Sequence, residues 1–593
     1  MSINKYLSVL LVIGLFSCNQ PSKNKTQSHS LPYVLDMVFN NPGEGKTDSK
    51  YIDPGFLKEI GYNGMVPHWY IECGITYDTF EKGILAENSK ERNWVLKKQA
   101  WIKTKLHEAE KADMPVYAFT DILVLPTVIL EKYKNEIVRE HKSASGFSAI
   151  HGKLVPDINK PLTQKLIRTQ IDELFSTFPE LDGLVIRFGE TYLFDTPFHS
   201  GGSPVKSGGE EGIEGHIKLI NILKEEICEK RNKKLFYRTW DFGFFHTNPE
   251  VFLKITDRIE PHKNLIFSIK YTKGDFHRLL PFNPTVGIGK HQYIVEFQGQ
   301  PEYYGKGAHP AYVFNGLLNG FEEYNQVMKP EDKQGIKDFL NDPKFAGLWT
   351  WSRGGGWQGP YISNELWCDV NARTALNWAK DTTLTEAAAL EKTALQIGVK
   401  PESINKFIKL VHLSADGCVR GHCSLIDIPE ARFNVWWLRD HFFSGLAPLK
   451  PFFNYAINNG KVEDVLAEKK ESVSIWKEIV ELASEIEMEN SDNQEFLKVS
   501  AEYGRIKYEI IEKAFTVMLL GFQGDKTGSY DKERINEAIA QYDNLWEEWK
   551  ELKKNNPSCA TIYFPDAFSI DSKGVSGNHS NGLGATIDKY RNL

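Results

Sequence analysis

The sequence contains little cysteine, which excludes a fold held together by disulfides. Seven cysteines occur in 593 residues, too few for a disulfide scaffold in a chain of this length. Cys418 and Cys423 have His422 between them, but no second pair has the spacing of a metal site. For this pair we favour buried thiols or one disulfide over a metal, and we expect neither a metal nor a cofactor.

The sequence also lacks a strong excess of charge of either sign. Lys and Arg total 71 against 78 Asp and Glu, a net charge of −7, so nucleic acid is not expected as a partner. No glycine-rich phosphate loop follows the first apolar run, which counts against a nucleotide-binding fold. Beyond the N-terminus, no apolar run is long enough to predict a transmembrane helix.

The N-terminus has the pattern of an export signal. Lys5 precedes a short apolar run, Tyr6 to Phe16, which is too short to span a bilayer comfortably. Leu15-Phe-Ser-Cys18 resembles a bacterial lipobox, which implies lipidation of Cys18. Residues 19–31 are polar and predict a flexible tether. We therefore expect residues 1–18 to be a lipoprotein signal peptide. The mature protein would be exported and held by acyl chains to a bacterial membrane, in the periplasm or on the outer surface.

Short apolar runs alternate with longer amphipathic runs between residues 32 and 380. Helical patterns are clearest at Glu91–Ala112, Leu162–Phe178 and Gly212–Arg231. The predicted strands are Tyr33–Val38, Asn63–Val66, Pro115–Phe119, Gly183–Arg187, Lys234–Arg238, Leu265–Ile269, Tyr293–Phe297 and Gly347–Trp351. This alternation predicts an α/β fold, a (β/α)8 TIM barrel, with a doubly wound open sheet as the rival. Residues 381–593 carry long helical stripes of apolar residues and predict a helical C-terminal domain.

Polar and aromatic residues follow the predicted strands, where a barrel places its working face. Carboxylates move protons and aromatic rings stack on the apolar faces of sugars. Four of the residues that follow the strands are cations: Arg187, Arg238, Lys270 and Arg353. A neutral sugar needs few cations, whereas a uronic acid needs at least one to bind its carboxylate. An alternative role for these cations is to pair with the acids. The candidate substrate-binding residues are His68, Trp69, Arg187, Arg238, Lys270, Glu296, Trp351, Arg353 and Trp357.

Three motifs carry a resemblance to a known family. They are Gly183-Leu-Val-Ile-Arg-Phe-Gly-Glu190, Ser268-Ile-Lys-Tyr-Thr-Lys-Gly-Asp-Phe276 and Glu296-Phe-Gln-Gly-Gln-Pro-Glu-Tyr-Tyr-Gly305. In order and spacing the chain resembles the α-glucuronidases of glycoside hydrolase family 67, inverting enzymes with a (β/α)8 barrel and a helical C-terminal domain. The resemblance implies that Glu190 is the general acid and that Asp275 and Glu302 are the carboxylates that activate water. It also implies that Arg238 contacts the uronate carboxylate.

The expected function is therefore the cleavage of an α-linked uronic acid from an oligosaccharide or polysaccharide. Two other interpretations stay open. In one, Glu190 and Glu296 are the acid and nucleophile of a retaining glycosidase. In the other, the protein binds glycans at the cell surface without cleaving them. In every case the expected partner is carbohydrate, with membrane contact through the lipid anchor only.

Overall fold

The computed structural model describes most of the chain. The described residues are 29–39, 48–139, 154–188, 191, 193, 196–241, 244–300, 304–354, 362–427, 449–559 and 583–593. The predicted signal peptide, with Cys18, and most of the predicted tether lie outside them.

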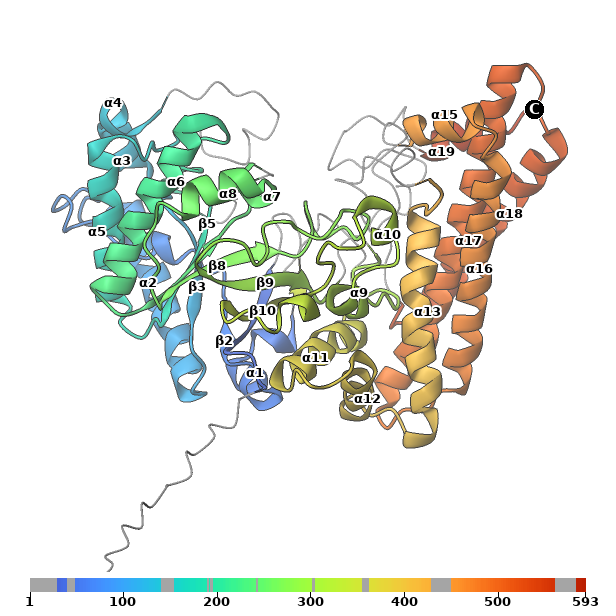
Figure 1. Cartoon of the computed structure of the whole chain (residues 1–593), viewed down its shortest axis with the longest axis horizontal. Helices are drawn as coiled ribbons and strands as arrows, with labels where there is room; N and C mark the ends of the chain where they lie inside the picture. Colours follow the sequence, from blue (N-terminus) through green and yellow to red (C-terminus); the bar gives the residue numbers. More distant parts are fainter. Residues whose placement is uncertain are drawn as a thin grey trace, which may run out of the picture.

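Eight parallel strands form a barrel. Their order is β2-β1-β10-β9-β8-β7-β5-β3, and every neighbouring pair is parallel. The two edge strands also meet, because the amide of Met65 donates to the carbonyl of Pro115 at 2.9 Å. The predicted (β/α)8 barrel is therefore confirmed, and the open doubly wound sheet is excluded (Figure 1).

All eight predicted strands occur within a few residues of their predicted bounds. They are β1 (Tyr33–Phe39), β2 (Gly64–Met65), β3 (Tyr117–Asp121), β5 (Gly183–Arg187), β7 (Lys234–Arg238), β8 (Leu265–Lys270), β9 (Gln292–Gln298) and β10 (Phe345–Gly354). The two-residue strands β4 (Leu125–Pro126) and β6 (His199–Ser200) pair with each other outside the barrel.

Helices surround the barrel on its outer side (Figure 1). Those between barrel strands include α1 (Pro54–Ile60), α2 (Lys90–Lys111), α3 (Thr127–Lys132), α4 (Lys134–Ile137), α5 (Pro161–Thr177), α6 (Gly209–Leu223), α7 (Phe244–Thr247), α8 (Pro249–Thr256), α9 (Phe314–Asn319) and α10 (Tyr324–Val327). The predicted helix over residues 212–231 is α6 continued by one π-helical segment, Lys224–Glu229. After β10, α11 (Leu366–Lys380) packs against that strand.

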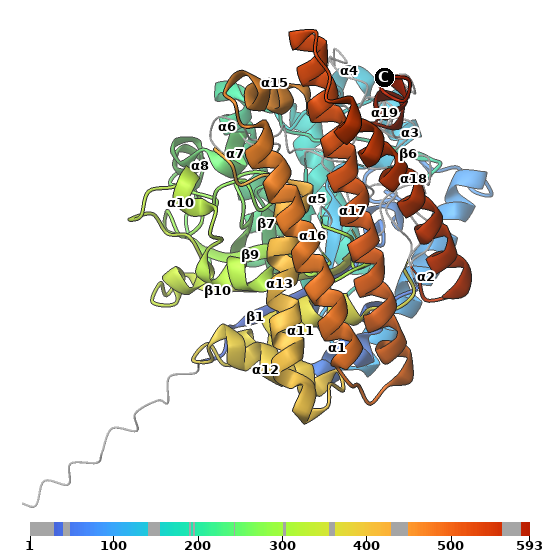
Figure 2. The same ribbon diagram turned by 90° about the vertical axis from the view of Figure 1, so that its right-hand side faces the viewer.

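The C-terminal region is helical, as predicted. It contains α12 (Glu386–Gln396), α13 (Ile404–His422), α15 (Lys450–Asn458), α16 (Val462–Glu485), α17 (Ser491–Thr527), α18 (Lys532–Asn555) and α19 (Leu583–Lys589). In Figure 2, α13, α16, α17 and α18 lie side by side. The apolar stripe of α16 faces this bundle, with Trp476, Ile479 and Ala483 buried. None of the described helices is long and apolar enough to cross a membrane.

Buried contacts join the helical region to the barrel. Arg278, in the loop after β8, forms a bidentate ion pair with Glu323 and donates to the carbonyl of Ala415 on α13 at 2.7 Å. Lys507 on α17 lies 3.3 Å from the imidazole of His309. The loops on this side of the barrel are therefore packed against the C-terminal helices.

The six cysteines in the described residues are buried thiols. Cys418 and Cys423 belong to this set, so the pair is two thiols rather than a disulfide.

Candidate active site

The strand register places an arginine beside an aspartate at the carboxyl end of β3 and β5. Asp121 and Arg187 are partners in the pairing of these two strands, and the guanidinium binds both oxygens of the carboxylate. Burial alone would raise the pKa of Asp121, but the charge and hydrogen bonds of Arg187 lower it below its usual value. Arg187 therefore forms an ion pair with Asp121. This is the alternative role, pairing with an acid, that the sequence analysis gave for the cations.

His68 lies against this pair. Its Nε2 is 3.8 Å from Asp121 Oδ2 and 3.5 Å from Arg187 Nη2. The ring stacks on Phe39 and contacts Tyr70, with centroids 5.2 Å and 4.2 Å away. Burial lowers the pKa of His68 to about 4, so the imidazole is neutral at physiological pH and can donate one hydrogen bond and accept another.

A second buried ion pair lies across β7 and β9. Arg238 Nε contacts Glu296 Oε1 and Oε2 at 3.0 Å and 2.9 Å, and Ser268 donates to Oε1 at 2.8 Å. The side chain of Glu296 is 0% exposed. Arg238 Nη2 is also buried and has no hydrogen-bond partner among the described residues. A buried N–H without a partner costs free energy, so this nitrogen is suited to an anionic oxygen of a ligand.

The third ion pair is the most open of the three. Lys270, at the end of β8, binds Asp275 in the following loop. The Lys270 side chain is 4% exposed, whereas that of Asp275 is 26% exposed. The ammonium lies 3.8 Å from the ring centroid of Trp240 and 4.5 Å from that of Phe276. Asp275 is therefore a carboxylate that solvent and substrate can reach, beside a cation enclosed by rings.

Aromatic rings connect the three pairs at one end of the barrel. Arg187 and Arg238 both lie over Phe119, at 5.0 Å and 5.6 Å. Arg238 and Lys270 both lie near Trp351, at 5.0 Å and 6.0 Å. The alternation of strand residues explains this, because every second side chain points into the barrel. The predicted residues brought together are His68, Arg187, Arg238, Lys270, Asp275, Glu296 and Trp351.

Two predicted residues lie elsewhere. Trp69 makes an edge-to-face contact with Trp101 on α2, at 6.1 Å between centroids. Arg353 is buried and binds Glu365 at the start of α11 and the carbonyl of Ile362. Both are therefore turned toward helices rather than toward the other ion pairs.

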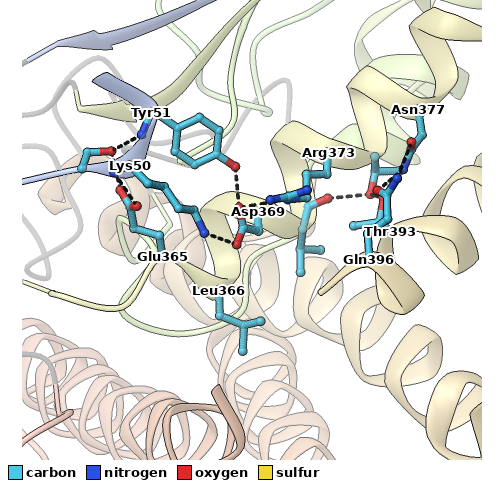
Figure 3. Close-up of polar contacts among 12 residues, drawn as sticks. Lys50, Tyr51, Glu365, Leu366, Asp369, Arg373, Asn377, Thr393 and Gln396 are labelled. Carbon is cyan, nitrogen blue, oxygen red and sulfur yellow. Dashed lines mark hydrogen bonds and ion pairs between the residues drawn. The ribbon is translucent and has the colours of Figure 1, made fainter. Parts of the chain in front are cut away.

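Figure 3 shows why Glu365 holds this position. It accepts hydrogen bonds from Ser49 and from the backbone amide of Lys50, in the segment that follows β1. One turn along α11, Asp369 binds Tyr51 at 2.6 Å and pairs with Lys50. The contacts of Arg353 thus belong to a polar network that fastens α11 to the barrel.

Glu72 and Asp36 are buried carboxyls that were not among the predicted site residues. Glu72 is fully buried, accepts the backbone amide of Asp121 at 3.2 Å, and has no partner for Oε2 among the described residues. Burial, aided by the charge of Asp121, raises the pKa of Glu72 to about 8, so it stays protonated at neutral pH. Asp36 in β1 is also buried. The signal was present in the sequence, since each is a lone acid in an apolar segment.

The remaining predicted residues, Glu190, Glu302 and Trp357, lie outside the described residues. Gln300 accepts a hydrogen bond from the amide of Gly354 at 2.6 Å and donates to the carbonyl of Lys306 at 2.5 Å. Within the described ranges, no group of three or more His, Cys, Asp or Glu side chains could hold a metal ion.

No protein-family model matches the sequence, and no curated protein matches it. Solved structures do share its fold. An enzyme of glycoside hydrolase family 138 that targets pectin rhamnogalacturonan II has a TM-score of 0.56 and 11% identity, over 95% of this chain and 67% of that one. The two chains therefore share a fold. A weaker match is a mutant O-GlcNAc hydrolase from Thermobaculum terrenum, with a TM-score of 0.40 and 9% identity, over 95% of this chain and 93% of that one. Another is a Flavobacterium johnsoniae chitobiase, with a TM-score of 0.32 and 13% identity, over 95% of this chain and 78% of that one.

Proposed function

We propose that this protein is a glycoside hydrolase that removes a uronic acid from an acidic oligosaccharide or polysaccharide. The observation that carries the proposal is the accessible Asp275 carboxylate beside Lys270. Near the same Trp351 ring lies Arg238, whose Nη2 has no hydrogen-bond partner among the described residues. A sugar carboxylate would satisfy Arg238, and Trp351 would support the apolar face of the ring. The shared fold with a glycoside hydrolase supports the reaction class.

In the proposed mechanism Glu190 protonates the departing glycosidic oxygen. Asp275 and Glu302 together deprotonate a water on the opposite face, which gives inversion. The Asp275 side chain is 26% exposed beside Lys270, so a water can reach its carboxylate. These roles follow the resemblance to the family 67 α-glucuronidases.

The contacts of Glu296 argue against the retaining alternative. A nucleophile must direct an oxygen at the anomeric carbon, but both oxygens of Glu296 are held by Arg238, and one of them also accepts a hydrogen bond from Ser268. We assign Glu296 the role of holding Arg238 in place. We also propose that the protein is exported and anchored through a lipid on Cys18, as its N-terminal sequence suggests.

The experiment is a screen of the purified protein on acidic oligosaccharides, with free uronic acid as the readout. Pectic fragments come first, because the enzyme of similar fold targets pectin rhamnogalacturonan II. Asp275→Asn should lower turnover by ~10² to 10⁴-fold. Glu331→Gln, at an exposed acid that is not among the candidate site residues, is the control and should act like the wild type.

Product stereochemistry separates the mechanisms. Proton NMR of the first product formed should show the inverted anomer. Release of neutral sugars alone, or undiminished turnover in Asp275→Asn, would refute the proposal.

A further inference from the structure

Helix α2 presents a tryptophan to solvent on the outside of the barrel. Trp101 is 42% exposed, the one tryptophan among the exposed large apolar side chains of the described residues. Trp69 contacts it edge to face at 6.1 Å, and Lys98 Nζ lies 4.6 Å from its ring centroid. An exposed indole fixed by a second indole is a rigid apolar surface of about the size of one sugar ring.

The helix around this ring is rich in cations. Between Glu91 and Glu108 the helix carries five cations and no acid, in a protein whose net charge is −7. Helical spacing places Lys97, Lys98 and Lys105 on the same face as Trp101, three or four residues away. Lys105 also pairs with Glu108 at 2.7 Å, a surface contact that contributes little. The lysines of this face therefore favour an anionic ligand.

This surface is connected to the candidate active site. Trp69 directly follows His68, which contacts the Asp121–Arg187 pair. A long chain bound at the mouth of the barrel could therefore continue outward past Trp69 to Trp101.

We propose that Trp69, Trp101 and the lysines 97, 98 and 105 form a second binding surface for an acidic polysaccharide, outside the active site. The identity of the ligand class rests on the proposed function. Indole rings would stack on the sugars and the lysines would contact their carboxylates. The pattern does not fit a helix that lies on a membrane, because exposed Leu96 is about 140° around the helix from Trp101, so no continuous apolar face exists.

Affinity electrophoresis of the full chain tests the proposal, in native gels containing polygalacturonate and in reference gels containing neutral dextran. Polygalacturonate should retard the wild type and dextran should not. Trp101→Ala should raise the dissociation constant for polygalacturonate about five- to tenfold. Leu96→Ala removes an equally exposed apolar side chain from the same helix and is the matched control. Its retardation should equal that of the wild type.

Equal retardation of Trp101→Ala and Leu96→Ala would overturn the proposal. So would a loss in Trp101→Ala that affects binding to phosphatidylglycerol vesicles but not to polygalacturonate, because this surface would then bind membranes. Direct binding keeps this test separate from catalysis. If Trp101 proves necessary for retardation while no uronic acid is released from any substrate, the proposed reaction fails and the binding surface stands.

Discussion

Arg238 combines two features that are unusual in one side chain. Its Nε is paired with the buried Glu296, and its Nη2 is buried without a partner among the described residues. A buried arginine N–H without a partner lowers the stability of the protein. A ligand carboxylate would supply the missing hydrogen-bond acceptor. The proposed substrate class depends on this nitrogen more than on any other single atom.

Arg238→Lys should reduce the preference for charged substrates. Lysine keeps an ion pair with Glu296 but cannot also offer a forked pair of donors. We expect kcat/KM on a uronide to fall about 10- to 100-fold, with little change on the matching carboxyl-reduced glycoside. Kinetics on both substrates measure this. Arg258→Lys, at an exposed ion pair with Glu214, is the control. An unchanged ratio between the two substrates would contradict the assignment.

Asp36 should give the barrel a measurable dependence on pH. Burial raises the pKa of Asp36 to about 7 from an ordinary value of 3.8, although Thr350 and Ser352 donate to it. The folded state therefore holds this proton more tightly than the unfolded chain. The stability that protonated Asp36 contributes is fully present below pH 4 and is lost as the pH rises through 7.

Asp36→Asn, which resembles the protonated form, should lose less stability between pH 5 and pH 8 than the wild type. The difference should be of the order of a few kcal/mol. Urea denaturation at the two pH values measures it, with Glu331→Gln as the control. Part of the pH dependence should remain, because Glu72 also has a raised pKa. A variant whose midpoints shift with pH as the wild type does would show that Asp36 is not the cause.

At the scale of elements, close contacts between strands set the shape of the barrel. Gly354 ends β10 with φ +100°, where an added Cβ would lie 1.7 Å from the carbonyl oxygen of Phe39. Its described surroundings show that it allows β10 to approach β1 closely.

Gly183 makes a second close contact, between β5 and β7. A Cβ there would lie 2.1 Å from the carbonyl oxygen of Lys234, which is backbone and cannot move aside cheaply. Gly183→Ala should therefore destabilise the protein by about 1–3 kcal/mol, as measured by urea denaturation. Gly55→Ala is the control. A Cβ added at Gly55 would have its nearest contact with the side chain of Asp53, at 3.1 Å. If the two variants have equal urea midpoints, then β5 and β7 can move apart without loss of stability, and the prediction is wrong.

At the scale of the whole molecule, the C-terminal helices support the loop that carries Asp275. Arg278, three residues further on, connects that loop to Glu323 and to α13. Glu323→Gln leaves the guanidinium buried without its counter-ion, so the free energy of unfolding should fall by about 3–5 kcal/mol. Activity should fall as well, because Asp275 loses its support.

The double variant Arg278→Met, Glu323→Met tests whether charge is the cause. It leaves no unpaired ion and should recover most of the lost stability, measured in the same denaturation series. If the double variant is as unstable as Glu323→Gln, packing rather than an unpaired charge explains the loss.

The sequence by itself determined the strands, the barrel and the helical C-terminal region. Periodicity of apolar residues is local, and each strand such as Gly183–Arg187 carries its own signal. The sequence also predicted where polar side chains gather, because residues after parallel strands meet at one end of a barrel.

The tertiary structure alone decided what those side chains do. Arg187 is paired with Asp121 and Glu296 is buried beneath Arg238, while Asp275 remains accessible. Trp69 and Arg353 turn toward helices. Pairing, burial and direction depend on neighbours that are distant in sequence, and burial determines whether a carboxylate can reach a substrate. Periodicity contains no information about such neighbours.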